Sequence, residues 1–500
     1  MSLYVIVLVG IVLSLLAVSL TRLGRVKTKA DYLVAGRTLP AFVLIFTLLS
    51  SWIGSGSLLA GAENAYRHGF AALWQAAGGW FGLLLIYFIA PRARKFAQFT
   101  IPDLLEARYS QTARVLGVIA ILFAYTGITS YQLIGGGDIL HLVFPAAISP
   151  LVGKYIMAAF VIVFTAIAGM SSVAYMDVFI GLLATVTMLV ALPFLAHSAG
   201  GWRAIHHALP ATHFEVLGDF TFVGAMELMI PTLLLMLGNQ AMYQKFFSAK
   251  SEHDARVAVV GWIIGTIILE TVIVAIAVVG SVLFPHGPVS HYPREIIAYT
   301  ALHGLPALLG ALLMGAVFAK IMSTANNFLF SPATNLINDV YVRYLSPNAS
   351  DRRILLVSRL TVVLLGVWSL YQTMNVTNVL QETLYAYTVY SAALTPVILA
   401  AFYSKRANAA GAVTAIGLGT FVTVLWNIAF PDGRVSHWIV RAGVAPHLAA
   451  QLALHDAIFP ALVAAVLGLV AVSVLTRPPS AEQVALFHSG AGEPARAEAD

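Results

Sequence analysis

Residues 50–62 read SSWIGSGSLLAGA and lie inside a long apolar stretch of the chain. The stretch contains three glycines and four serines, which are poor material for a stiff helix that faces lipid. Two interpretations are open. Small residues let neighbouring helices pack closely, or the helix is locally unwound and its freed carbonyl groups coordinate a cation.

The composition is that of a membrane protein. The chain has 500 residues, of which 59% are hydrophobic and 10% charged, and its mean hydropathy is +0.86. A soluble chain carries about 25% charged residues, whereas a membrane-spanning helix needs about 20 consecutive apolar residues. We therefore expect an all-α polytopic protein of the cell (inner) membrane that contacts the lipid bilayer and binds no nucleic acid. The absence of cysteine excludes thiolate catalysis and cysteine-based zinc sites.

The apolar stretches predict about 13 transmembrane helices. They lie at residues 3–20, 40–62, 70–90, 113–143, 151–169, 174–198, 220–243, 256–283, 307–340, 354–375, 380–403, 408–430 and 455–476.

Basic residues fix the predicted orientation of these helices. With the N-terminus outside, about 21 of the 28 Lys and Arg residues fall in inside segments and about six outside, as the positive-inside rule requires. An odd number of helices then puts the C-terminus inside. We expect a transmembrane domain over residues 1–476 and a short polar cytoplasmic tail over 477–500, disordered and too small for an output domain such as a kinase.

A lysine interrupts the predicted helix at 307–340. Residues 315–327 read GAVFAKIMSTANN, and Lys320, Ser323 and Thr324 share one helical face by their i, i+3, i+4 spacing. A lysine at mid-bilayer costs about 2.5–3.5 kcal/mol, so it needs a partner or must lose its proton. The candidate partners are the acids of the predicted helices, Asp138, Asp177, Glu227, Glu270 and Glu382.

Several segments, in this order, resemble the sodium/solute symporter family. They are DYLVAGRTLP (31–40), TIPDLLEARY (100–109), ITSYQLIGGGDIL (128–140), VAYMDVFIG (173–181), GNQAMYQKFFSAKSEHDAR (238–256), AKIMSTANN (319–327) and LYAYTVYSAALTPVILAAFYSKR (384–406). The resemblance implies a five-plus-five inverted repeat of the leucine-transporter type over about residues 40–403. The helices at 3–20, 408–430 and 455–476 would be peripheral.

The resemblance also implies a sodium site between the second and ninth helices. Its ligands would be the carbonyls of Ser50, Ile53 and Lys320 and the hydroxyls of Ser323 and Thr324. Asp177 matches a family acid near the inner side of this site, which implies a role in ion release or as the partner of the lysine.

Position 320 departs from the family pattern, because the family normally has a small residue there. Two like unit charges about 4 Å apart repel by about 4 kcal/mol at an effective dielectric constant of about 20. Such a repulsion costs about a thousandfold in affinity. Lys320 therefore either takes the place of the sodium ion or points its amine inward and leaves the site intact.

The solute pocket is expected between the second, third, fourth, seventh and eleventh helices. Its candidate residues are Trp52, Ser55, Ser57, Gln75, Gln132, Asn239, Gln240 and Tyr387. Residues 232–237, TLLLML, replace the aromatic and polar lining of the sugar-carrying branch, so an amino acid or organic acid is favoured over a sugar.

We therefore expect a secondary active symporter that moves a small organic solute by alternating access, with Na⁺ as coupling ion. The alternative is a proton-coupled or ion-independent transporter in which Lys320 replaces sodium. A membrane sensor is a third reading. The sequence contains no catalytic constellation and calls for no cofactor, and it does not determine the oligomeric state.

Overall fold

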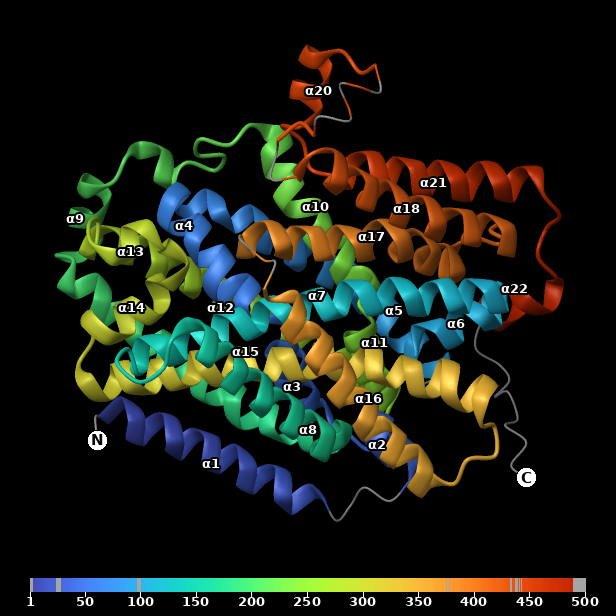
Figure 1. Ribbon diagram of the computed structural model, residues 1–500, viewed down its shortest axis with the longest axis horizontal. Coiled ribbons are helices and arrows are strands. Elements are labelled where there is room, and N and C mark those ends of the chain that lie inside the picture. Colours follow the sequence, from blue (N-terminus) through green and yellow to red (C-terminus); the bar gives the residue numbers. More distant parts are fainter. Residues whose placement is uncertain are drawn as a thin grey trace.

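The computed structural model describes residues 3–488, apart from 24–27, 97–99, 375, 377, 432–433, 437–438, 440 and 442. Within these residues the chain is a bundle of long helices, most of which run along one axis (Figure 1). Twelve helices of the described residues are long and apolar enough to cross a membrane, and the short apolar helix α3 (Ala41–Trp52) comes in addition.

The helical bounds follow the predicted ones closely. The long elements are α1 (Leu3–Leu23), α5 (Leu73–Phe96), α7 (Gln111–Val143), α8 (Pro150–Ser198), α10 (Phe222–Gly238), α12 (Glu252–Leu283), α15 (Ala307–Asn335), α16 (Asp351–Gln372), α17 (Val379–Tyr403), α18 (Ala409–Ala429) and α21 (Ile458–Leu475). Shorter elements that matter below are the π-helices η2 (Gly56–Gly61) and η6 (Leu336–Leu345), and the α-helices α4 (Ala62–His68), α6 (Ile101–Arg108), α11 (Gln240–Ser248) and α22 (Ala481–His488).

Side-chain caps explain where several of these helices begin. Ser110 caps α7, Ser149 caps α8 and Ser251 caps α12, each by accepting a hydrogen bond from a backbone N–H of the first turn. Such a cap satisfies a donor that has no partner inside the helix. Polar residues between apolar runs therefore mark the helix starts.

The first helix of each predicted half is broken. The second helix of the chain consists of α3, η2 and α4, and α3 ends at Ile53 in an extended conformation (φ −82°, ψ 100°). The seventh consists of α10 and α11, which meet at Asn239 in a similar conformation (φ −61°, ψ 111°). Residues 50–62 are therefore locally unwound, whereas coordination of a cation by the freed carbonyls stays a prediction. The equivalent position of the second half is unwound as well.

The predicted fifth and sixth helices form one element, α8, which is interrupted at Gly169. Its φ of 62° lies in the left-handed region that favours glycine. A Cβ at this position would also lie 3.0 Å from the ring of Tyr32. The prediction of two helices thus holds in geometry, with a single residue as the joint.

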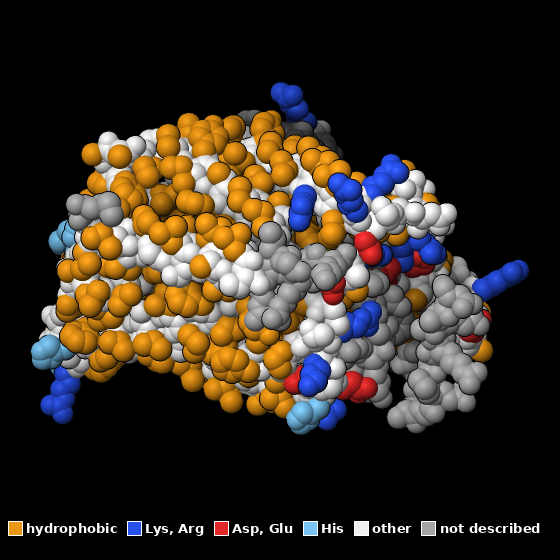
Figure 2. All heavy atoms as spheres, turned by 90° about the horizontal axis from the view of Figure 1, so that it is seen from below, with side chains coloured by type: hydrophobic (Ala, Val, Ile, Leu, Met, Phe, Trp, Pro, Cys, Tyr) orange, Lys and Arg blue, Asp and Glu red, His pale blue; other side chains and the backbone are white. Residues whose placement is uncertain are grey.

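The outer surface separates into an apolar part and a basic end. Figure 2 shows hydrophobic side chains over most of this face and Lys and Arg gathered at the end where α22 lies. Large apolar side chains such as Phe88, Phe123 and Leu364 are exposed on the long helices, as lipid contact requires. Since α1 begins at the opposite end (Figure 1), the described chain starts and ends at different ends of the bundle. Which end faces the cytoplasm, and the count of 13, remain predictions.

The predicted tail is partly ordered. Residues 481–488 form α22, whose Phe487 ring lies 5.9 Å from that of Phe402 in α17. The expectation of disorder is wrong for these residues, because their apolar face packs on the bundle. Residues 489–500 lie outside the described residues.

The crossing of α7 and α8 is tight enough to test. A Cβ at Gly153 would lie 2.5 Å from the carbonyl oxygen of Gly137, and one at Gly137 would lie 2.7 Å from the backbone nitrogen of Lys154. We expect Gly153→Ala to force these backbones apart and to cost about 1–3 kcal/mol. The measurement is the melting temperature of the purified protein in detergent.

Gly417→Ala in α18 is the matched control, because nothing lies within 4 Å of a Cβ at that position. Alanine favours a helix by about 1 kcal/mol over glycine, so this variant should melt at or above the wild-type temperature. Equal melting temperatures for both variants would contradict the proposed crossing.

Candidate functional site

The break after α3 leaves carbonyl groups without helical donors, and Thr324 of α15 meets them. Its Oγ1 lies 2.8 Å from the carbonyl oxygen of Ser50, 3.1 Å from that of Ile53 and 3.0 Å from that of Lys320. The three carbonyls therefore converge on one small region between α3 and α15. Neutral oxygens of this kind suit a hard cation such as Na⁺.

Asp177 of α8 lies beside this region and is 1% exposed. Its carboxylate accepts hydrogen bonds from the hydroxyl of Ser323, from Thr47 Oγ1 at 2.5 Å and from Asn327 Nδ2 at 3.4 Å. Ser50 Oγ also donates to the Asp177 backbone carbonyl at 3.2 Å. The structure thus brings together all six residues of the predicted cation site, from α3, α8 and α15.

Lys320 points its amine into the same cluster. The residue is fully buried, and its Nζ donates to Ser50 Oγ at 3.2 Å. Among the described residues no carboxylate lies within 4.0 Å of this nitrogen, so Asp177 is a member of the cluster without being its ion-pair partner. An ammonium at this position does not fit beside a bound cation.

The other candidate acids have different partners. Asp138 pairs with Arg294 at 3.2 Å, and Glu227 pairs with His455 at 2.9 Å. Glu270 accepts hydrogen bonds from two tryptophans at a separate cavity. None of these three acids of the described part of the chain forms an ion pair with Lys320, so the predicted pair is not seen with them either.

A second buried lysine was missed by sequence reasoning. Lys245 of α11 was counted with the inside basic residues, yet it is fully buried. Its Nζ donates to Ser51 Oγ and, at 2.7 Å, to Asn327 Oδ1. The apolar residues around it in AMYQKFF were the one available signal. The cluster thus contains two lysines, Lys245 and Lys320, and one carboxylate.

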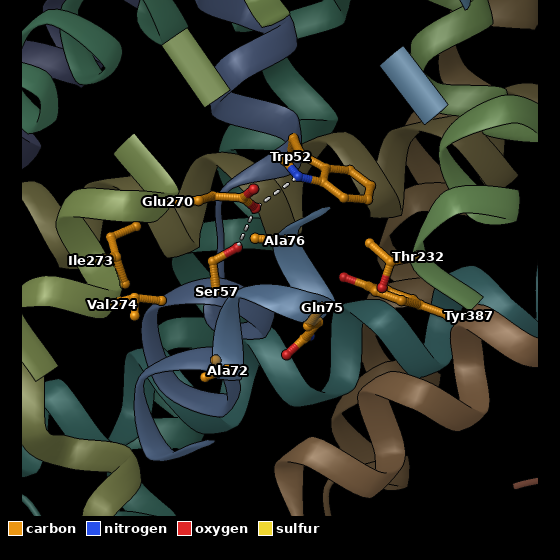
Figure 3. Close-up of a pocket in the computed structure, with 11 residues that line it drawn as sticks. Trp52, Ser57, Ala72, Gln75, Ala76, Thr232, Glu270, Ile273, Val274 and Tyr387 are labelled. Atoms are coloured by element: carbon orange, nitrogen blue, oxygen red, sulfur yellow. Dashed lines mark hydrogen bonds between the residues drawn. The ribbon is translucent and has the colours of Figure 1, made fainter. Parts of the chain in front are cut away.

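A cavity of about 380 Å³, the open space at its mouth included, lies on the other side of the α3 break (Figure 3). Its lining comes from α3, η2, η3 (Gly69–Ala72), α5, α10, α12 and α17. The polar and aromatic side chains among the lining residues are Trp52, Ser57, Gln75, Thr232, Glu270 and Tyr387. Small-molecule sites are typically concave and largely apolar, with a few convergent polar groups.

Four of the eight predicted pocket residues line this cavity, namely Trp52, Ser57, Gln75 and Tyr387. Two more lie at the break itself, where the backbone N–H of Ser55 donates to Gln132 Oε1 at 2.7 Å. Asn239 and Gln240 are not among the lining residues, because they hold the start of α11. Asn239 caps that helix, and Gln240 Oε1 accepts from the Ile101 backbone at 2.5 Å.

The expected set of pocket helices changes in one place. The eighth helix, α12, contributes Glu270, Ile273 and Val274, whereas no residue of α7, the predicted fourth helix, lines the cavity. Glu270 was noticed in the sequence only as a partner for a lysine, because an acid inside an apolar helix does not reveal which neighbour its side chain faces.

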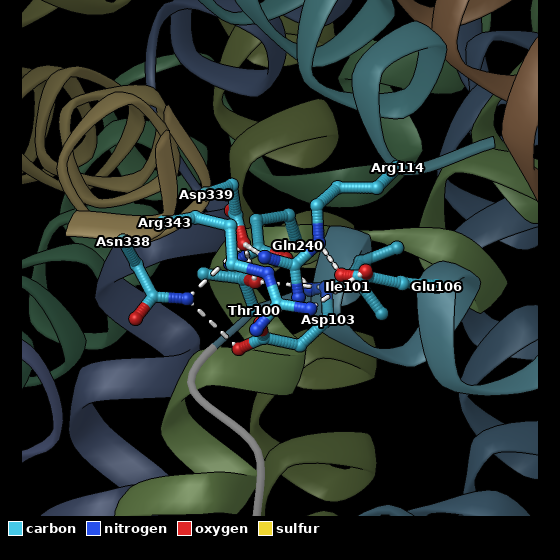
Figure 4. A network of polar contacts seen from close by, with 9 residues as sticks. All are labelled: Thr100, Ile101, Asp103, Glu106, Arg114, Gln240, Asn338, Asp339 and Arg343. Atoms are coloured by element: carbon cyan, nitrogen blue, oxygen red, sulfur yellow. Dashed lines mark hydrogen bonds and ion pairs between the residues drawn. The ribbon is translucent and has the colours of Figure 1, made fainter. Parts of the chain in front are cut away.

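A polar network joins four elements at one end of the bundle (Figure 4). Arg114 of α7 contacts Asp103 at 2.5 Å and Glu106 at 2.6 Å, both in α6, and Asp339 of η6 at 3.6 Å. Arg343 of η6 contacts Glu106 at 2.9 Å. The network ties the first half of the chain to the second half, and the short bond from Gln240 to Ile101 adds α11.

The arrangement therefore has three parts: an oxygen-lined region at the break of α3, a cavity next to it, and a closed end held by charge pairs. No catalytic chemistry follows from it. What it permits is the binding of a cation and a small solute at adjacent positions inside a membrane bundle.

Comparisons with known proteins agree with this geometry. A profile of the sodium:solute symporter family matches residues 32–419. The osmoregulated proline transporter OpuE of Bacillus subtilis is 27% identical over 417 residues, which cover 79% of this chain and 83% of that protein. The sodium/proline symporter of Staphylococcus aureus is 24% identical over 472 residues, which cover 90% of this chain and 88% of that protein.

Solved structures show the same fold. A Na⁺-coupled sialic acid symporter in a substrate-bound, outward-open state superposes with a TM-score of 0.76 at 18% identity, covering 95% of this chain and 98% of that one. The nucleobase-cation-symport transporter Mhp1 in a closed conformation gives a TM-score of 0.56 at 11% identity. These chains share the leucine-transporter type of fold that the sequence predicts. The chain is a multi-pass membrane transport protein and belongs to the sodium:solute symporter family.

Proposed function

We propose that this chain moves a small amino acid across the cell membrane by alternating access, with Na⁺ as the coupling ion. Family membership supports the symporter class, and relatives named for proline support an amino acid as solute. The lining of the cavity, apolar with a few polar groups and one acid, fits such a solute.

One observation supports coupling most directly: the cation region and the cavity share the broken helix. Ser50 and Ile53 offer their carbonyls to the cation region, while Trp52 and Ser57 line the cavity. A cation that orders this segment also orders the cavity wall. Since the coupling of two ligands is reciprocal, the solute then strengthens cation binding by the same factor.

Alternating access needs an end that opens, and the polar network fits that role. Arg114 and its partners join α6 and α7 to η6, so the two halves cannot separate there while these pairs persist. Repeat-built transporters expose a central site by rocking one repeat against the other. We infer that the network is the closed gate of this conformation.

Lys320 favours a second candidate for the coupling step. Its buried amine donates to Ser50 Oγ, next to the carbonyls that would hold sodium. In the first candidate, Na⁺ binds only after this amine moves or loses its proton. In the second, the ammonium replaces the ion outright, and transport is proton-coupled or independent of ions.

Counterflow tests the transport function without any assumption about the coupling ion. Purified protein in liposomes loaded with unlabelled proline should accumulate labelled proline from outside, because exchange across one site needs no ion gradient. Protein-free liposomes are the control. Absence of exchange with proline and with other small amino acids would contradict the proposal and favour a sensor.

The variant Lys320→Ala tests the coupling candidates. We expect removal of the amine to lower the Na⁺ concentration that half-saturates a rise in melting temperature by at least about tenfold, because a like charge leaves the site. Wild type and variant are titrated with Na⁺ against K⁺ at fixed ionic strength. If the melting temperature of the wild type does not respond to Na⁺ and that of the variant does, the second candidate, in which the ammonium replaces the ion, is supported.

An unchanged Na⁺ response in Lys320→Ala would contradict both candidates, since the lysine would then not act on the site. Lys250→Ala is the matched control, because Lys250 is exposed at the start of the loop before α12 and its loss should leave the response unaltered.

Glu106→Gln tests the gate. Glu106 forms ion pairs with both Arg114 and Arg343, so the variant weakens two pairs and should favour the state that is open at that end. Because the chain has no cysteine, Ala76→Cys in the cavity wall supplies a single label site. We expect maleimide labelling from the network end to rise about tenfold, the effect of one lost charged hydrogen bond.

The control is Glu63→Gln, which removes an exposed pair with Arg67 in α4. Equal labelling rates in Glu106→Gln, Glu63→Gln and the parent would mean that the network does not hold the gate closed.

A further inference from the structure

Glu270 is buried in the wall of the cavity and is held by donors only. Its Oε1 accepts from Trp52 Nε1 at 3.0 Å and from Ser57 Oγ at 3.3 Å, and its Oε2 accepts from Trp80 Nε1 at 2.9 Å. The indole N–H has no acceptor capacity, and an ionised carboxylate is acceptor-only. Both oxygens thus accept hydrogen bonds from the protein, an arrangement that suits a carboxylate.

An ionised Glu270 has no cationic partner among the described residues. No Lys, Arg or His nitrogen of the described residues lies within 4.0 Å of the carboxylate, and Glu270 is the one charged residue among those described as lining the cavity. A buried charge without a counter-charge is costly. A positively charged group of a ligand in the cavity would supply the missing counter-charge.

Two further features of the wall favour a cation. Gln75 is 7% exposed, and its Oε1 accepts no hydrogen bond from the described residues, so an acceptor is left free toward the cavity. The rings of Trp52 and Tyr387 stack with their centroids 6.3 Å apart and an interplanar angle of 25° (Figure 3). Aromatic faces attract cations, most strongly when water is excluded.

We propose that Glu270 is the binding residue for a positively charged nitrogen of the solute, with Gln75 Oε1 and the rings of Trp52 and Tyr387 around it. The inference rests on the proposed function, because it takes the cavity as the solute site. It narrows the solute to an ammonium-bearing compound, such as an amino acid, and excludes organic acids that lack nitrogen. The expected organic-acid class is thereby dropped.

The cavity also explains how such a solute would be selected. An ammonium N–H that reaches the carboxylate forms a charge-assisted hydrogen bond. An ether oxygen at the same place would oppose the carboxylate with its lone pairs and leave it unpaired. Replacement of one N–H group by oxygen should therefore abolish binding, even when ring and carboxylate are kept.

The test is the melting temperature of the purified protein titrated with two sets of probes. Proline, glycine betaine and choline carry a positive nitrogen, whereas tetrahydrofuran-2-carboxylate and propionate do not. We expect at least one probe of the first set, and neither of the second, to stabilise the wild type. Glu270→Gln should weaken that binding by about 10- to 100-fold, since a hydrogen bond to a charged group is lost.

Glu227→Gln is the matched control, because Glu227 pairs with His455 and is not among the lining residues. If Glu270→Gln fails to fold, Glu270→Asp keeps the charge and shortens its reach, and the comparison of probes on the wild type needs no variant. Stabilisation by an acid without nitrogen, or equal affinity in Glu270→Gln, would overturn the inference, as would a wild type that binds no ammonium probe.

Counterflow separates this failure from failure of the proposed function. A protein that exchanges propionate and ignores every amine remains a transporter, although Glu270 then has another role. If the protein binds an amine through Glu270 but exchanges no solute, the inference about Glu270 stands and the proposed transport function is contradicted.

Discussion

The structure depends on how the open backbone of the second helix is satisfied inside an apolar bundle. At the end of α3 the chain leaves the helix, and the carbonyls of Ser50 and Ile53 lose their helical donors. Lipid supplies no replacement, so such a break persists only where protein or a bound cation meets it. Here the hydroxyl of Thr324 does so, which ties α3 to α15 and fixes the position of the cavity wall beside it.

The charges around this break are unusual for a cation site. Lys320 and Lys245 place two amines next to a single carboxylate, Asp177, and Asn327 links Lys245 to it by bonds of 2.7 and 3.4 Å. A further cation adds to a positive excess when both amines are protonated. Cation binding and protonation of the lysines therefore oppose each other by linkage. The two coupling candidates are the two limits of this competition. In one, Na⁺ binds and the Lys320 amine is displaced or neutral; in the other, the protonated amine excludes Na⁺.

Much of the fold follows from the sequence, because long apolar runs, capping serines and a positive-inside bias are local signals. The break at residues 53–55 was visible in its glycines and serines, and the meeting of Ser50, Asp177 and Thr324 followed from the family pattern. The side-chain directions were not visible. The apolar neighbours of Lys245 are only a weak signal that α11 turns it inward, and nothing near Glu270 in the sequence shows that α12 faces the cavity. Asn239 and Gln240 resembled pocket residues because polar groups at a helix break serve capping and binding equally well.

The most direct test of the coupling account is proline uptake into liposomes under an imposed ion gradient. An inward Na⁺ gradient should drive accumulation of labelled proline, whereas an inward proton gradient in Na⁺-free buffer should leave uptake at the rate of gradient-free liposomes. Uptake that follows the proton gradient and ignores Na⁺ would contradict sodium coupling at the break of α3. It would favour the second candidate, in which the ammonium group of Lys320 takes the place of Na⁺.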